Sequence, residues 1–559
     1  MVSLIMLSVM GSTFLAVGAF ILLSNEWKVF HDKEWLLLAL YCVLGIILLY
    51  FAYRFDLDER PNATTTALIA LEQTLRERFN PHERPNATTT MLAAWVQVVP
   101  GDDACAPVLG DPSPKAAPPI GGCSPQFSAR AVVSGANDCP TIAIKRNTGA
   151  ITGIRMEKRQ GYAGKGLQGV TVCAAPADGD TSQVKFSEKL TISVTEHWSE
   201  SRPIVLFGDS GCKLAEERDC DSSGWPFETV ANQAKTEQPG LVVHLGDYVY
   251  RDNDDWNTWK KYFFDPAKSL LEAAPWILVR GNHERCSSEE GQYPRGYHLL
   301  FGDGPAMPCN SVLELVKPYA VDLSKQFRLI VADSAAAFAK DPVQTMSSEC
   351  GTKGSIAIDR VDAKVCAAIM DVLEAVKTLA SSAKGSHTSG EEGAAQPQVW
   401  LATHVPVFGF ERKGIKDDIP IPSAMMLGAW KGAGVKGVDL IVSGDRHVHQ
   451  VVTTEGEPDQ ISAGTGGVAL DDLPYANGSK ANVAKFVTLK TSIAISGTNY
   501  DAGKTISRDM VAKIAPMPSF SQEGCSYQGF GFLMVEWQNG YGRPSFKPVS
   551  SIPPQQSCP

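Results

Sequence analysis

The sequence predicts a layered α/β fold for residues 201–545. Short apolar runs rich in β-branched residues, such as Leu241-Val242-Val243, alternate with stretches of helical spacing. This alternation is typical of sheets flanked by helices. The helical stretches are residues 226–238, 256–272 and 361–380. Five of the apolar runs end in Asp, Asn or His, and ligand sites in open sheets gather at the carboxyl ends of strands. We therefore expect the strand-end loops to carry a site.

Residues 1–55 are expected to form a transmembrane helical hairpin. Leu4–Leu23 is overwhelmingly apolar, and Trp35–Tyr53 carries no charge. Each stretch is about the length that spans a bilayer. A cleaved signal peptide is the weaker interpretation, because the start has no basic region. A pair of core helices in a soluble protein is the remaining alternative.

Residues 56–99 are expected to form a stalk or an amphipathic, partner-binding helix. The octapeptide ERPNATTT occurs twice, at 59–66 and 83–90. Between the copies, apolar residues recur at helical spacing at Leu68, Leu71, Leu75 and Phe79. Together with the hairpin, this segment suggests a partner within a membrane complex.

Residues 100–200 are expected to form a small β-domain, a sandwich, that packs beside the catalytic domain and carries no chemistry. Short β-type runs alternate there with turn signals, as at Ala131-Val132-Val133 before Ser134-Gly135. Later in the chain, residues 470–518 lack periodicity and are expected to form an insertion near the mouth of the site. Phe530–Trp537 predicts a final strand, and residues 546–559 a Pro/Ser-rich tail.

Charge and cysteine content limit the partners and the compartment. The net charge of -10 argues against nucleic acid as a partner. Twelve of the 13 Cys lie outside the apolar N-terminal segment and none forms a CxxC pair, which favours disulfides and an oxidising compartment over buried free thiols. Sequence neighbours suggest Cys212–Cys220 and Cys286–Cys309. The positive-inside rule does not decide the orientation of the hairpin. The cysteines therefore lead us to expect residues 54–559 outside the cytoplasm, in a periplasm or a lumen.

The five strand-end stretches share oxygen and imidazole donors. They are Gly208-Asp209-Ser210-Gly211, Gly246-Asp247-Tyr248-Val249-Tyr250, Gly281-Asn282-His283-Glu284, Thr403-His404 and Gly444-Asp445-Arg446-His447. Hard oxygen ligands mixed with imidazoles suit Fe, Mn or Zn rather than a soft thiolate metal. Two ions that share one carboxylate form the arrangement used for phosphoester hydrolysis.

Over residues 200–540 the chain resembles the calcineurin-like metallophosphoesterases. The GDxG form at Asp209 and the GDxxY form from Asp247 to Tyr250 resemble, more narrowly, the purple acid phosphatase branch. The resemblance implies a metallophosphoesterase β-sandwich flanked by helices. It also implies two metal ions, Fe(III) plus a divalent Fe, Mn or Zn, and attack by a metal-bound hydroxide on a phosphate ester.

The resemblance further implies a role for each motif residue. Asp247 bridges the two ions, and His283 protonates the leaving alcohol or, with Asn282, holds the phosphate. The remaining ligands are Asp209, Tyr250 and His447 for the first ion, and Asn282, His404 and Asp445 for the second.

One motif departs from the family, which shows Gly-His-x-His where this chain has Gly444-Asp445-Arg446-His447-Val448-His449. If the strand end sets the register, Asp445 replaces the first His. If the loop is shifted by two residues, His447 and His449 are the pair. A carboxylate ligand would favour harder ions such as Mn, Mg or Fe in the second site. Arg446 is a candidate phosphate contact or a salt-bridge partner.

Three functional hypotheses follow. The first is a membrane-anchored, extracytoplasmic phosphomonoesterase with two metal ions. The second is a phosphodiesterase of the same fold, because the motifs do not separate the two substrate classes. The third, from a different class, is a weakly active or inactive accessory subunit of a membrane complex, and co-purification in a stoichiometric complex without metal would favour it.

Overall fold

The computed structural model describes residues 90–549 and 555–556 with internal gaps, all within the second of two compact units, Pro85–Pro559. The gaps are residues 102–103, 108, 110–116, 135–137, 160–168, 178, 195–201, 214–219, 221–224, 251–254, 285–299, 302–314, 338–359, 386–395, 409, 414–416, 421–423, 453–455, 472–485, 489–492, 496–497, 501–504, 508–524 and 539–540. The expected transmembrane hairpin and the ERPNATTT repeat therefore lie outside the described residues, apart from Thr90. No helix among the described residues is long and apolar enough to span a bilayer.

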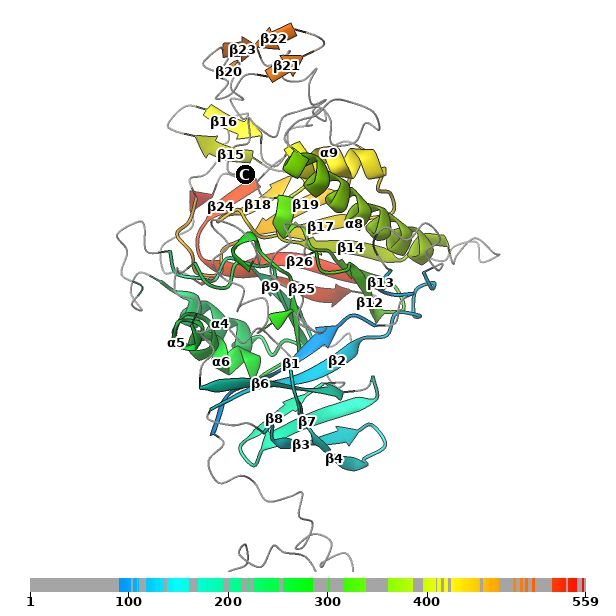
Figure 1. The fold of residues 1–559 in the computed structure, drawn as a ribbon, viewed down its shortest axis with the longest axis vertical. Helices are drawn as coiled ribbons and strands as arrows, with labels where there is room; N and C mark the ends of the chain where they lie inside the picture. Colours follow the sequence, from blue (N-terminus) through cyan, green and yellow to red (C-terminus); the bar gives the residue numbers. More distant parts are fainter. Residues whose placement is uncertain are drawn as a thin grey trace, which may run out of the picture. The chain divides into compact units, whose positions relative to one another are not determined.

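Two large sheets form the centre of this unit (Figure 1). The nine-stranded sheet has the order β26-β25-β9-β10-β11-β1-β2-β6-β5. Its strands are β1 (Thr90–Val99), β2 (Gln126–Ser134), β5 (Glu157–Lys158), β6 (Val170–Ala177), β9 (Ile204–Phe207), β10 (Leu241–His244), β11 (Trp276–Leu278), β25 (Gly531–Gln538) and β26 (Tyr541–Pro548). Strands β9, β10 and β11 are parallel, so their carboxyl ends meet at one edge.

The eight-stranded sheet has the order β12-β13-β14-β17-β19-β18-β24-β27. Its strands are β12 (Tyr319–Ser324), β13 (Phe327–Val331), β14 (Gln398–Thr403), β17 (Leu440–Ser443), β18 (His449–Val452), β19 (Asp459–Ala463), β24 (Cys525–Gln528) and β27 (Gln555–Gln556). Strands β13, β14, β17 and β19 are parallel. Their carboxyl ends carry His404 and Asp445.

Alternating side chains show how the sheets are layered, because successive residues of a strand face opposite sides. In β9, Leu206 joins the core between the two sheets, whereas Phe207 packs against helices on the outer face. In β14, Trp400 faces the inter-sheet core and Leu401 faces the other helical layer. The result is a helix–sheet–sheet–helix arrangement, which confirms the predicted layered α/β fold.

The helices cover the outer faces of the sheets. Helix α4 (Phe227–Thr236) and the continuous segment α5 (Trp256–Trp259), η4 (Lys260–Phe264) and α6 (Asp265–Leu271) cover the nine-stranded sheet. Helices α8 (Arg360–Gly385) and α9 (Ala424–Ala433) lie side by side on the eight-stranded sheet (Figure 1). Two short 3₁₀ turns, η5 (Asn282–Glu284) and η6 (Ala335–Ala337), follow β11 and β13. The three helical stretches predicted from spacing are thus confirmed.

The expected stalk ends earlier than residue 99. Thr90–Val99 is strand β1, which lies between β11 and β2 in the nine-stranded sheet. Its middle residues are buried on both faces: Trp95 faces the helices and Val96 faces the inter-sheet core. A strand buried on both faces shows no apolar–polar alternation, so the sequence pattern did not reveal it.

The separate β-domain expected for residues 100–200 is not confirmed. Strands β2, β5 and β6 extend the nine-stranded sheet. A second sheet, β4-β3-β7-β8, is formed by β3 (Thr141–Arg146), β4 (Ile151–Arg155), β7 (Thr181–Ser187) and β8 (Leu190–Ser193). Its Ile144 and Val184 belong to the same apolar cluster as Ala129 and Ala175 of β2 and β6. One apolar core is therefore shared by the four-stranded sheet and the nine-stranded sheet.

The C-terminal third also differs from the expected boundaries. Strand β26 crosses residue 546, and β27 pairs with β24, so parts of the expected tail belong to the sheets. Within residues 470–518 the structure describes two small antiparallel pairs. They are β20 (Phe486–Thr488) with β23 (Thr505–Ser507), and β21 (Ile493–Ile495) with β22 (Thr498–Tyr500). A third pair joins β15 (Phe410–Lys413) to β16 (Asp417–Pro420).

Disulfides join Cys105 to Cys123, Cys139 to Cys173 and Cys212 to Cys220. The predicted Cys212–Cys220 bond is confirmed. The predicted Cys286–Cys309 bond lies outside the described residues. Disulfides persist in oxidising compartments, so these bonds suggest an extracytoplasmic setting.

Candidate metal centre

Three aspartates sit in loops directly after parallel strands and share an unusual backbone conformation. Asp209 follows β9, Asp247 follows β10 and Asp445 follows β17. Their φ angles are 57°, 58° and 63°. This left-handed region is uncommon for residues other than glycine, and such conformations cluster at functional sites. The sharp turns direct three carboxylates to the same edge of the two sheets.

Glycines allow these loops to approach one another closely. A Cβ atom on Gly281 would overlap Asp247 Oδ1 and the backbone nitrogen of Asp247. A Cβ atom on Gly444 would lie 2.8 Å from Asp209 Oδ2 and 2.9 Å from His404 Nδ1. Any larger residue at either position would therefore push the carboxylates apart.

The first group of side chains contains Asp209, Tyr250 and His447. The Tyr250 hydroxyl donates to Asp209 Oδ1 at 2.9 Å and lies 3.3 Å from His447 Nε2. The same His447 nitrogen is 3.5 Å from Asp209 Oδ1. These three residues come from three different strand-end loops, and their polar atoms converge on one point.

The second group contains Asn282, His404 and Asp445. His404 Nε2 lies 2.9 Å from Asn282 Oδ1 and 3.9 Å from Asp445 Oδ1. Its other ring nitrogen, Nδ1, lies 2.7 Å from the carbonyl oxygen of Leu245 and can donate to it. That bond orients the ring so that Nε2 faces the other ligands.

Asp247 lies between the two groups. Its Oδ1 is 3.4 Å from His404 Nε2, and ligand atoms of Asp209, Asp247 and His404 all lie within 4.8 Å of one another. The backbone N–H of His283 donates to Asp247 Oδ1 at 3.0 Å, and His283 Nε2 is 4.0 Å from Asp247 Oδ2. This is the place that a bridging ligand would occupy.

Electrostatics at the centre reflect buried acids that face imidazoles. Burial raises the pKa of Asp209, and its hydrogen bond to His447 opposes the rise. Burial also acts to raise the pKa of Asp247, but the charges of His404 and His283 bring it well below the usual range. Burial would lower the pKa of His447, yet the contacts with Asp209 and Asp471 raise it to about 9.

The donor set fits metal ions. Asp209 and His404 are fully buried, and Asp247 and Asp445 nearly so. Buried carboxylates need positive charge nearby, and here the acceptor atoms Asn282 Oδ1 and His404 Nε2 also converge at 2.9 Å. Carboxylate, amide, phenol and imidazole donors in one cluster suit Fe, Mn or Zn. The residues present can thus hold two ions, with Asp247 shared.

His449 lies away from the candidate metal ligands, whereas Arg446 lies beside one of them, Asp445. His449 lies in strand β18, where its ring stacks on Phe546 at 4.4 Å, and burial lowers its pKa to about 4. Arg446 Nε lies 3.2 Å from Asp445 Oδ2. The geometry therefore brings Asp445 and His447, and not His449, to the other predicted ligands.

Glu284 is a residue of the site to which the sequence assigned no role. It is fully buried, and its carboxylate accepts the backbone N–H groups of Gly281, Asp247 and Tyr248 at 3.0, 3.0 and 2.9 Å. Burial and the charge of Asp247 raise the pKa of Glu284 to about 8, against the effect of its hydrogen bond to the N–H of Tyr248. Its position directly after Asn282-His283 was the available signal.

Asp333 supports the neighbouring loop, and no sequence motif marks it. It forms a buried ion pair with Arg280, with Arg280 Nη2 2.8 Å from Asp333 Oδ2. The same carboxylate accepts the N–H groups of Val316 and Ala335. This pair joins the loop after β11 in one sheet to the loop after β13 in the other.

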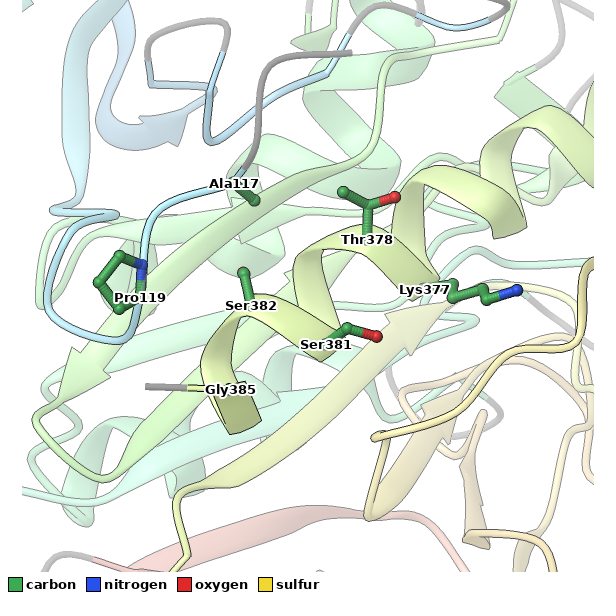
Figure 2. A pocket seen from close by; sticks show the side chains of 7 residues that line it. All are labelled: Ala117, Pro119, Lys377, Thr378, Ser381, Ser382 and Gly385. Atoms are coloured by element: carbon green, nitrogen blue, oxygen red, sulfur yellow. The ribbon is translucent and has the colours of Figure 1, made fainter. Parts of the chain in front are cut away.

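A separate hollow of about 640 Å³ lies along the C-terminal half of α8 (Figure 2). Lys377, Thr378, Ser381, Ser382 and Gly385 line it from the helix, and Ala117 and Pro119 line it from the facing segment. None of the predicted metal ligands is among these seven residues, so the hollow is not the candidate centre.

The part of the chain that carries the first five predicted site residues matches a known family. Residues 202–327 match the family model of the calcineurin-like phosphoesterases. The expected resemblance to this superfamily is thereby confirmed. The matched segment contains Asp209, Asp247, Tyr250, Asn282 and His283, whereas His404, Asp445 and His447 lie beyond it. No curated protein is significantly similar to the chain.

The solved structures that the chain matches include two phosphatases. A purple acid phosphatase from yellow lupin (Lupinus luteus) seeds is 12% identical, with a TM-score of 0.39, over 83% of this chain and 93% of its own. A dimetal phosphatase from Danio rerio is 11% identical, with a TM-score of 0.29, over 64% of this chain and 99% of its own.

Proposed function

We propose that this chain is a dimetal phosphoesterase that hydrolyses phosphomonoesters outside the cytoplasm, attached to a membrane by its N-terminal segment. The observation that carries the proposal is the convergence of seven side chains from five strand-end loops into two groups that share Asp247. A calcineurin-like segment over residues 202–327 supports the same reaction class.

The proposed ligands divide as the geometry groups them. Asp209, Tyr250 and His447 would hold a first ion, for which the phenol oxygen favours Fe(III). Asn282, His404 and Asp445 would hold a second, divalent ion. When bound, the two ions would activate water and neutralise the charge of the phosphate.

His283 is suited to protonate the leaving alcohol. Its side chain is 29% exposed, compared with 13% for His447 and 0% for His404, so it lies nearest to solvent among the three. Its ring packs against Tyr250 at 4.4 Å, and its backbone N–H is bound to Asp247. Imidazole side chains commonly act as general acids in enzymes, which suits this step.

The extracytoplasmic location is supported by the disulfides, and membrane attachment by the apolar segments within residues 1–55. A phosphodiesterase would use the same site and differ only in its substrate. The alternative of an inactive accessory subunit is motivated by Asp445, which replaces an expected His ligand.

The test is to purify the full-length chain, count its bound metals and measure hydrolysis of a phosphomonoester and a phosphodiester in the same sample. We expect two metals per chain and faster turnover of the monoester. Faster turnover of the diester would establish the phosphodiesterase instead. A folded chain that keeps fewer than two ions and shows no turnover after addition of Fe, Mn or Zn would contradict the enzyme and favour the accessory subunit.

Replacement of Asp445 by His is expected to shift the metal preference of the second site. His tolerates a positive φ better than most residues, so the turn at 63° can be kept. Imidazole favours Zn²⁺ over Mn²⁺ more than a carboxylate does. We expect the Zn/Mn ratio bound in competition to rise about 10-fold. Asp445→Asn, which removes the charge without adding an imidazole, is the control, and an unchanged ratio in Asp445→His would exclude Asp445 as a ligand.

A further inference from the structure

His447 also contacts Asp471, a residue that is not among the proposed metal ligands. Its backbone N–H donates to Asp471 Oδ2 at 3.0 Å. In return, the N–H of Asp471 donates to the carbonyl oxygen of His447 at 2.9 Å. The two residues are 24 positions apart, so this pairing is a tertiary contact and not a local turn.

The two nitrogens of the His447 ring face different carboxylates. Nδ1 lies 3.6 Å from Asp471 Oδ1, whereas Nε2 lies 3.5 Å from Asp209 Oδ1 and 3.3 Å from the Tyr250 hydroxyl. A proton on Nδ1, the nitrogen that faces the Asp471 carboxylate, would leave the lone pair of Nε2 directed at Asp209 and Tyr250. Carboxylates that orient a metal-binding His in this way commonly set its tautomer.

The loop that carries Asp471 also supports Asp209. After β19, the N–H of Gly466 donates to the carbonyl oxygen of Gly208, and the N–H of Val468 donates to that of Asp209, both at 2.9 Å. The loop from 464 to 471 thus contacts the backbone at two ligands of the first group. Asp471 is the residue of this loop whose side chain reaches His447.

We propose that Asp471 is a positioning residue that holds the His447 ring with Nε2 directed toward the first metal ion. This inference rests on the proposed function. It adds a residue outside the family motifs, Asp471, to those that binding of the first ion requires.

The experiment uses the full-length chain loaded with Zn²⁺ and compares Asp471→Asn, Asp471→Ala and Asp459→Asn. Asn at 471 keeps an oxygen for the N–H of His447 but removes the charge. Asp459 is an exposed residue at the start of β19, so its variant controls for the loss of one negative charge. The first readout is the chelator concentration that removes each ion, and the second is turnover as a function of added Zn²⁺.

In both Asp471 variants we expect one of the two ions to bind about 10- to 100-fold more weakly. Turnover should fall at low Zn²⁺ and recover at high Zn²⁺, which a general loss of structure would not allow. Asp459→Asn should behave like the wild type. If both Asp471 variants keep two ions at wild-type affinity, the inference is wrong while the proposed function stands. If the wild-type chain itself does not bind two ions, the proposed function fails and the inference fails with it.

Discussion

Asp247→Asn is expected to lower phosphomonoester turnover about 10³-fold and to remove at least one metal ion. Among the described residues, Asp247 is the carboxylate that forms a cluster with both Asp209 and His404. The ligand atoms of these three residues all lie within 4.8 Å of one another. Asn has nearly the same shape, so the N–H of His283 keeps an acceptor. What is lost is the negative charge that two cations would share.

Metal content and turnover should be measured together on the folded variant, with Asp247→Ala beside it. The Ala variant is expected to lose at least as much metal, because it also removes the acceptor for His283. Asp459→Asn serves as the surface control. If Asp247→Ala keeps two metals and full turnover, the assignment of the whole centre is wrong, because no other residue in the described part of the chain is placed between the two ligand groups.

Glu284→Ala is expected to lower both stability and turnover. The substitution leaves three buried backbone N–H groups, those of Gly281, Asp247 and Tyr248, without their acceptor. An unsatisfied buried donor costs about 1–3 kcal/mol, and relief of the repulsion between Glu284 and Asp247 offsets part of this, so we expect a net loss of about 2–4 kcal/mol. Turnover should fall about 10²-fold, because the backbone of Asp247 is no longer held.

The stability change is measured as the shift in Tm of the metal-free chain, so that lost metal does not contribute. Glu284→Gln should lie between the wild type and Glu284→Ala, because one of its two terminal atoms can still accept. Glu228, exposed in the first turn of α4, provides the control variant Glu228→Gln, for which we expect almost no shift. An unchanged Tm in Glu284→Ala would mean that the loops after β10 and β11 are held together by other contacts.

Much of the layered α/β fold could be predicted from the sequence, because its strands and helices follow local patterns of apolar residues. The runs at Ile204–Phe207 and Leu241–His244 are short and mostly apolar, a glycine follows each within two residues, and both are strands. Stretches of helical spacing became α4 and α8. Strand β1 was missed because it is buried on both faces, and burial by distant partners leaves no periodic signal.

The sequence predicted those residues of the candidate site that lie in the strand-end motifs. Asp209, Asp247, Tyr250, Asn282 and His404 come together as expected. The choice between Asp445 with His447 and His447 with His449 stayed open in the sequence, because two residues of loop length cannot be resolved from spacing alone. The structure brings His447 to Tyr250 and stacks His449 on Phe546 instead.

Local periodicity and residue chemistry were sufficient to predict the layered fold class, the types of candidate ligand and their order along the chain. The contacts of Glu284 with the loops after β10 and β11, and of Asp471 with His447, are seen only in the folded chain. Such contacts join residues 24 to 37 positions apart through backbone groups that every residue possesses. A backbone N–H leaves no mark in a sequence, so its side-chain acceptor is recognised only when the fold brings the two together.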